Sequence, residues 1–150
     1  MSCEISYETV SDVSASWDRL KLSQKNYQER FGELIFSHLF ELEPEILKLF
    51  KFSDLKSPEF VAHAKVMVDM LDCVVGFLGP ELDPLKKDLQ RLGKRHFTYG
   101  VTADYLPEME SAVLYAFDQM LGKKLSRNER NAWQALFYFM IKHMANGMYA

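Results

Sequence analysis

The sequence has only two cysteines, Cys3 and Cys73, in 150 residues. They lie far apart and have no metal-type spacing, so the sequence predicts neither a disulfide framework nor a zinc site, and a reducing setting is the default. No segment approaches the roughly 18 apolar residues that cross a membrane, and no basic and then apolar signal segment follows Met1. We therefore expect a cytoplasmic protein.

An excess of charge of one sign is also absent. The chain has 18 basic and 21 acidic side chains and a net charge of -3. Such a chain has no positive field that would concentrate nucleic acid or an anionic membrane surface. We expect neither as a partner.

The alternating apolar and β-branched runs that predict strands are missing, and no repeat, low-complexity tract or linker divides the chain. We expect one all-helical domain over residues 1–150, with residues 1–8 as a short flexible extension. A domain of this size buries roughly 68–70% of its unfolded surface and can enclose a cofactor. The 13% of aromatic residues and the eight methionines can either pack against each other or line such a pocket.

Turn and cap residues mark the expected helix ends. Ser57-Pro58 opens a helix that Gly79-Pro80 closes, Asp83-Pro84 opens one that Gly100 ends, and the capping box at Ser126 to Glu129 opens one that Asn146-Gly147 stops. The pattern predicts about seven helices, near residues 9–22, 24–42, 44–50, 58–78, 84–98, 103–121 and 127–146. Their unequal lengths and early prolines favour steep crossing angles over a regular bundle.

Two histidines fall on apolar helical stripes. Leu85, Leu89 and Leu92 recur at spacings of four and three, and the next step of four reaches His96. The second stripe, in the helix predicted near 58–78, starts at His63 and continues through Met67, Leu71, Val74 and Leu78. Both histidines are therefore predicted to face the interior.

A single inward histidine is usually a hydrogen-bonded core residue, whereas two on facing helices could flank one iron. Burial disfavours imidazolium, so each ring would be neutral and keep a nitrogen lone pair for a metal. Zinc would need further protein ligands, which the stripes do not supply, whereas haem brings four nitrogens of its own. We expect His38 and His143 to be structural or surface residues.

Several motifs, taken in order, resemble the globin family and, within it, the neuroglobin-like members. Residues 35–50 resemble the passage into the haem pocket, with Pro44 and Phe50 at the family's distance of six. Residues 57–63 match the start of the distal helix, residues 92–96 and 99–101 the proximal motif and the turn after it, and residues 131–137 the last helix. The resemblance covers about residues 9–149, and the 33 residues from His63 to His96 are close to the family spacing.

The resemblance implies an all-α globin fold around a non-covalently held b-type haem. It implies that His96 is the proximal iron ligand, His63 the distal histidine and Phe50 a residue stacked on the haem, with Ala64 small where two helices cross. The cofactor-binding set that it implies is Phe36, Leu49, Phe50, Phe52, His63, Lys65, Val66, Met67, Leu92, Arg95, His96, Tyr99, Val101, Leu106, Met109, Phe137 and Met140.

The sequence departs from the neuroglobin-like pattern around the distal helix. The stretch from Phe50 to His63 is shorter and has no cysteine. Val66 stands where those chains place a basic residue, so Lys65 and Arg95 are the candidate cations for the haem propionates. Met67 replaces a branched aliphatic residue, and its flexible thioether could narrow the site or be oxidised.

The resemblance implies reversible binding of O2, CO, NO or a similar diatomic gas, for storage or transport, with His63 coordinating the iron when no ligand is present. One alternative is a haem redox enzyme of the NO dioxygenase or nitrite reductase type, served by a separate reductase because the chain has no nucleotide-binding glycine motif. A haem-based sensor and a cofactor-free helical module are further alternatives. The oligomeric state stays open at this point.

Overall fold

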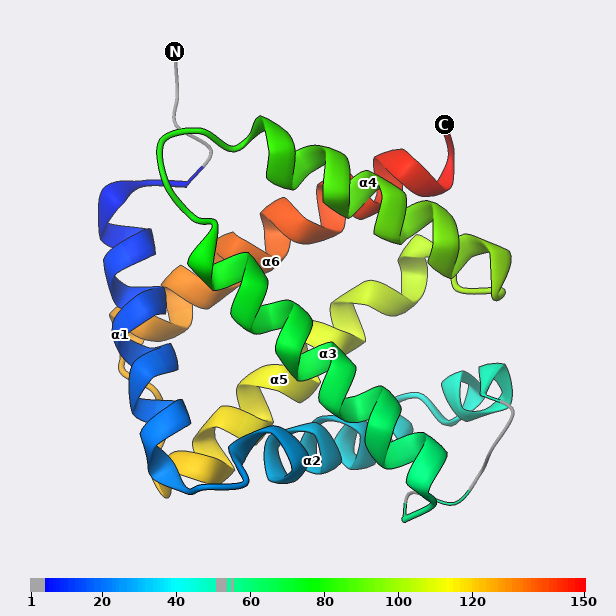
Figure 1. Ribbon diagram of the computed structural model, residues 1–150, viewed down its shortest axis with the longest axis horizontal. Coiled ribbons are helices and arrows are strands. Elements are labelled where there is room, and N and C mark those ends of the chain that lie inside the picture. Colours follow the sequence, from blue (N-terminus) through cyan, green and yellow to red (C-terminus); the bar gives the residue numbers. More distant parts are fainter. Residues whose placement is uncertain (1–4, 51–53, 55) are drawn as a thin grey trace.

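The computed structural model describes residues 5–50, 54 and 56–150 (Figure 1). Within these residues the chain folds into six α-helices and two 3-10 helices, and no strand occurs among them. In chain order the elements are α1 (Tyr7–Ser23), α2 (Tyr27–Leu42), η1 (Pro44–Leu49), α3 (Pro58–Gly76), α4 (Asp83–Thr98), η2 (Ala103–Tyr105), α5 (Leu106–Leu121) and α6 (Arg127–Met148). The prediction of an all-helical fold is confirmed.

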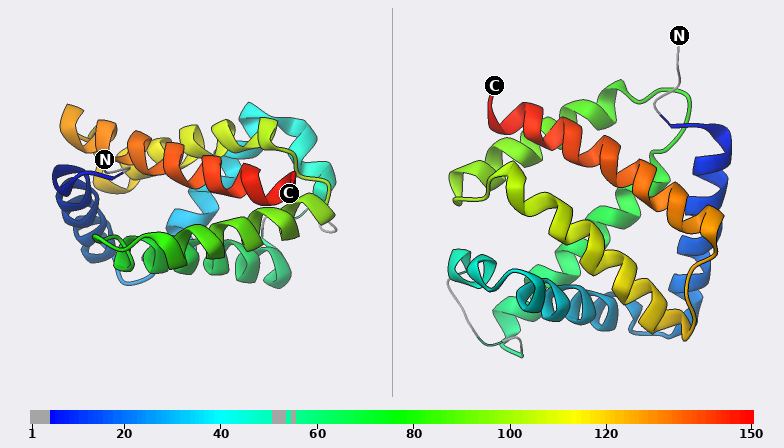
Figure 2. Two further views of the ribbon diagram at one scale, coloured as in Figure 1. Left: turned by 90° about the horizontal axis from the view of Figure 1, so that it is seen from above. Right: turned by 180° about the vertical axis from the view of Figure 1, so that it is seen from behind.

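The long helices form two layers, which the left view of Figure 2 shows from the side. Helices α3 and α4 lie in one layer and α5 and α6 in the other, with α1 along one edge. The most extensive contact joins α4 to α6, while α2 packs against both α5 and α3. The backbones of α3 and α4, which carry the two stripe histidines, make few contacts with each other.

Local capping explains several helix starts. The Ser57 hydroxyl accepts a hydrogen bond from the Phe60 amide at 3.2 Å, and Ser126 and Glu129 form the predicted capping box. The Ser6 hydroxyl caps α1, which begins at Tyr7 rather than near residue 9. Residues 7 and 8 are therefore helical and not part of a flexible extension, and Ile5 is buried.

Other helix ends lie within a few residues of the predicted ones but not at the predicted start and stop residues. Helix α3 ends at Gly76, before the predicted Gly79-Pro80 stop, and α4 already includes Asp83, with Leu82 as the preceding cap residue. Gly147 does not stop α6, which continues to Met148, and this glycine instead allows a close backbone contact with Gln90 of α4. Gly100, which follows α4, has a φ of 94°, the left-handed conformation expected of a glycine at a helix end.

Four aromatic rings from four helices fill the centre of the core. Trp17, Phe31, Phe117 and Trp133 are at most 1% exposed, and their ring centroids lie 4.9 to 6.1 Å apart. The Trp133 indole donates a hydrogen bond of 2.7 Å to the buried Ser16 hydroxyl, which itself donates to backbone carbonyls. Each fully buried side chain of this kind stabilises the fold by roughly 1.5–3 kcal/mol.

Helices α2 and α3 cross at a point of backbone contact. A Cβ atom added at Gly32 would lie only 2.9 Å from the Ala64 Cβ. The predicted need for a small residue at position 64 is confirmed, and the partner that requires it is Gly32. Among the described residues, no helix is long and apolar enough to cross a membrane.

Candidate functional site

His96 lies near the end of α4 and is half-buried. Its Nδ1 atom is 2.8 Å from the backbone carbonyl oxygen of Leu92, one turn earlier. A carbonyl only accepts, so this contact places the proton on Nδ1 and leaves Nε2 with its lone pair. A histidine held in this way presents Nε2 to a metal, since a hydrogen bond at one ring nitrogen sets the orientation of the other.

His63 lies on α3 among aromatic rings. Its ring centroid is 5.5 Å from that of Phe36 and 5.1 Å from that of Phe50. His63 is nevertheless exposed, so the prediction that both histidines face the interior is wrong for His63, while His96 is half-buried. Burial lowers the pKa of His63 below its ordinary value of 6.5, and the nearby His96 lowers that pKa further. The lowered pKa favours the neutral ring of His63 at pH 7, and the electrostatic effect of His96 indicates that the two rings are near enough to interact.

Four phenylalanines form an aromatic wall beside His63: Phe36, Phe40, Phe50 and Phe60. Their neighbouring rings meet mostly edge to face, at centroid separations of 5.3 to 6.0 Å. The sequence prediction included Phe36 and Phe50 and missed the other two. Helical spacing could have found them, because Phe40 lies four residues after Phe36 and Phe60 three before His63.

An apolar cleft of about 340 Å³ separates α3 from α4. Leu92, which was predicted to line the proximal side, lies on this cleft one turn before His96. The other lining residues were not in the predicted cofactor-binding set, and they are Met70, Cys73, Val74, Phe77, Leu85, Asp88 and Leu89. Val74 belongs to one predicted stripe and Leu85, Leu89 and Leu92 to the other, so part of each stripe lines this cleft.

The other predicted site residues divide by exposure. The buried or half-buried ones are Leu49, Met67, Val101, Leu106, Met109, Phe137 and Met140. Lys65, Val66, Arg95 and Tyr99 are exposed, so they lie outside the apolar lining. Val66 and Tyr99 are 66% and 63% exposed. Phe52 lies outside the described residues.

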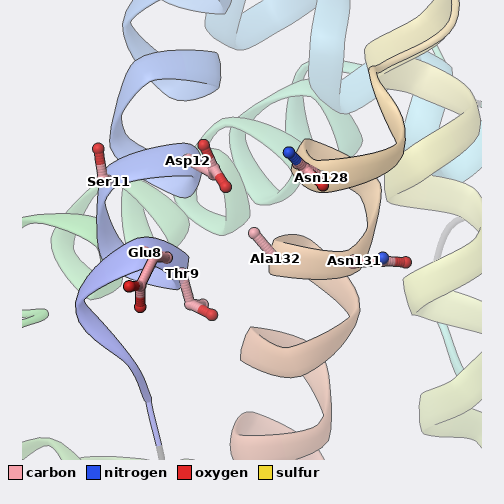
Figure 3. A pocket seen from close by; sticks show the side chains of 7 residues that line it. All are labelled: Glu8, Thr9, Ser11, Asp12, Asn128, Asn131 and Ala132. Carbon is pink, nitrogen blue, oxygen red and sulfur yellow. The ribbon is translucent and has the colours of Figure 1, made fainter.

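A second pocket, of about 500 Å³, has a different chemistry. It lies between the start of α1 and the start of α6, and is lined by Glu8, Thr9, Ser11, Asp12, Asn128, Asn131 and Ala132 (Figure 3). None of these is a predicted site residue, and all of them except Ala132 have polar side chains. The cleft between α3 and α4 suits a planar apolar group such as a porphyrin, whereas this polar pocket does not.

The two histidines fit haem better than a metal held by protein ligands alone. Within the described part of the chain, no three His, Cys, Asp or Glu side chains gather as a metal-binding group. Two imidazoles, from the helices that flank one apolar cleft, instead suit an iron that already has four porphyrin nitrogens. The residues present therefore fit the cofactor that the sequence suggested.

Comparison with known proteins decides the family. The globin family model matches residues 33–144, which include both histidines and the aromatic wall. The chain belongs to the globin family. This globin is 30% identical over 143 residues to neuroglobin of Chaenocephalus aceratus, and 29% identical over 143 residues to neuroglobins of Tetraodon nigroviridis and Danio rerio. Each comparison covers 90% of this chain and 87% of the relative, and membership of the family implies haem.

Proposed function

We propose that this globin holds a b-type haem non-covalently between α3 and α4, and that it serves to bind O2 or another diatomic gas reversibly in the cytoplasm, for storage or transport. The observation that carries this proposal is the pairing of His96, whose Nδ1 donates to the Leu92 carbonyl, with His63, whose pKa His96 helps to lower, on the two helices that flank an apolar cleft. When bound, haem supplies the iron at which such a gas binds.

The chain's own residues have separate tasks in this proposal. His96 anchors the iron, and the Leu92 carbonyl fixes the orientation of its ring. Phe36 and Phe50 keep water from the distal side, since their rings already pack against His63. Lys65 and Arg95 are exposed, where they can reach the carboxylates of a porphyrin without being desolvated.

We further propose that His63 coordinates the iron when no external ligand is present. Its lowered pKa supports this role, because only the neutral ring has a nitrogen lone pair to offer. Internal coordination competes with a gas and reduces the apparent affinity by the fraction of open sites. If one site in a hundred were open, the penalty would be about 2.7 kcal/mol.

Absorption spectra of the haem-loaded protein test both proposals. Ferrous wild type prepared without O2 or CO is expected to show a Soret band and the split visible bands of low-spin, six-coordinate iron. His63→Leu should lose the split bands and keep the Soret band, whereas His96→Ala should retain little haem. His38→Ala serves as the control, because His38 stacks on Tyr115, with ring centroids 3.8 Å apart, on a different pair of helices.

The outcomes separate the two proposals. Normal haem retention in His96→Ala would overturn the assignment of the iron anchor. A single broad high-spin band in the wild type would overturn coordination by His63 and leave haem binding intact. Absence of any Soret band after haem addition would overturn the proposed function as a whole.

A further inference from the structure

The last turn of α6, together with Tyr149 directly after it, makes three contacts with α4 and the segment that follows α4. A Cβ atom at Gly147 would lie 1.9 Å from the Gln90 carbonyl oxygen, and one at Gly93 would lie 2.0 Å from the Met144 carbonyl oxygen. Both separations are shorter than any stable contact, so each glycine lets the backbone of one helix rest on that of the other. The two glycines are reciprocal, one on each helix.

The third contact lies at the end of α4. The ring of Tyr149 meets that of Phe97 edge to face, with centroids 5.6 Å apart. The Tyr149 hydroxyl also accepts a hydrogen bond of 3.1 Å from the Ala103 amide, at the start of η2. Tyr149, one residue beyond α6, therefore contacts both α4, which carries His96, and η2, which follows α4.

These contacts lie on both sides of His96 in the sequence. Gln90, Gly93 and Phe97 are spaced by three and four, so they form one stripe along α4. Gly93 directly follows Leu92, whose carbonyl oxygen is bonded to His96 Nδ1. Helix α6 therefore contacts the α4 backbone next to the carbonyl that accepts this hydrogen bond. Tyr149 contacts Phe97, the residue that directly follows His96.

We propose that residues 144–149, through Gly147 and Tyr149, are the positioning element for His96 and set the orientation of its imidazole. This inference rests on the proposed role of His96 as the iron anchor. Groups that orient a metal-binding histidine typically change metal affinity by about 10–100-fold when they are altered. The expected effect of disturbing this element is thus a change in the histidine's orientation and in cofactor retention, beyond a loss of stability.

The experiment compares Gly147→Ala with Gly76→Ala. Gly76 is also helical, but a Cβ there would meet nothing within 4 Å, so it is the matched control for adding a methyl group. The first measurement is amide hydrogen exchange of α4 in the haem-free proteins, and the second is the hyperfine-shifted proton signals of the His96 ring in the ferric, cyanide-saturated proteins. We expect Gly147→Ala to exchange faster in α4, to shift the His96 signals and to release haem about 10-fold faster.

Tyr149→Phe and Tyr149→Ala give an independent test, because neither substitution pushes the backbones of α4 and α6 apart. The phenylalanine keeps the ring contact with Phe97 and loses the hydroxyl, so its His96 signals should move less than those of the alanine variant. Tyr138→Ala is the control, because Tyr138 is on the same helix and 73% exposed. If Gly147→Ala does not fold, this pair decides the question.

Two results would overturn the proposal. One is a folded Gly147→Ala with the α4 exchange, His96 signals and haem release of Gly76→Ala. The other is a Tyr149→Ala protein whose His96 signals match those of Tyr138→Ala. In either case a wild type that binds haem through His96 keeps the proposed function, whereas a wild type without a Soret band refutes that function separately.

Discussion

The aromatic core around Trp17 and Trp133 and the aromatic wall around His63 are built from similar side chains, but they differ in how completely those side chains are shielded from solvent. The core rings are at most 1% exposed, and the indole of Trp133 has a buried hydroxyl partner. In the wall, Phe36 and Phe60 are also buried, but Phe40 and Phe50 are only half-buried and His63 is exposed. The same residue types thus form a closed region in one place and an open one in the other.

This difference separates the source of stability from the site of function. A closed aromatic cluster gains nearly all of its burial energy from the protein itself. An open one leaves part of that energy for a group that enters the cleft and covers the rings. Substitutions in the core should therefore lower the stability of the haem-free protein, and substitutions in the wall should act mainly on the complex.

The largest expected effect is in the core. Trp133→Ala should lower the free energy of unfolding of the haem-free protein by about 3–5 kcal/mol, because it removes a fully buried ring that contacts Trp17 and Phe117. Urea unfolding followed by circular dichroism measures this change. Trp133→Phe keeps a ring in place and should cost less, so an equal loss in both variants would contradict the importance of ring packing.

A smaller effect on stability is expected in the wall. Phe50→Ala should lower the unfolding free energy of the haem-free protein by about 1–2 kcal/mol, since each aromatic pair adds roughly 0.5–1.5 kcal/mol and the ring is only half-buried. The same variant should release haem faster, which transfer of haem to an excess of apomyoglobin measures. Phe50→Leu is the control for lost volume, and unchanged haem release in both would remove Phe50 from the site.

The smallest effect concerns an ion pair between α1 and α6. A hydrogen bond from Arg19, together with the Ser126 cap, lowers the pKa of Glu129 from 4.5 to about 2. Its stabilisation is present above the unfolded pKa and is lost as the pH falls from about 4.5 toward 2. Arg19 is 45% exposed, so solvent screening limits the contribution to about 1 kcal/mol or less.

We therefore expect Arg19→Ala to destabilise the protein at pH 7 and to lose that difference from the wild type near pH 2. Urea unfolding across this pH range measures it. Arg30→Ala is the control, since Arg30 and Glu33 form an exposed pair within one helix. A difference between Arg19→Ala and the wild type that does not depend on pH would show that Glu129 titration is not involved.

Features that depend on local sequence could be predicted, and features that depend on distant contacts could not. The capping box at Ser126 and the stripe leading to His96 need only neighbours within one or two turns. Gly147 was misread as a helix stop because its partner, the Gln90 carbonyl, is 57 residues away in the sequence. Tyr149 was overlooked for the same reason, since Phe97 and Ala103 become its neighbours only in the folded chain.

The site itself was only partly predictable. The sequence proposed the two histidines from periodicity and Phe36 and Phe50 through resemblance, and the structure brings Phe36, Phe50 and His63 together. Several residues of the cleft between α3 and α4 were not predicted, because an apolar stripe on one helix does not show where a cleft separates that helix from its neighbour. The separation of α3 from α4 depends on the contacts of α4 with α6 and of α3 with α2.

The crossing of α2 and α3 at Gly32 and Ala64 has a consequence for how this site could diversify. Backbone and a single methyl group set the spacing at the crossing itself, whereas Phe36 on α2 and Phe60 on α3 pack ring against ring, with centroids 5.3 Å apart. His63, which is next to Ala64 and exposed, could therefore be exchanged without moving the two helices, while Phe36 is part of their interface. Ligand preference can evolve, or be engineered, at position 63 by one side chain, whereas any residue larger than glycine at position 32 would change the spacing of the helices.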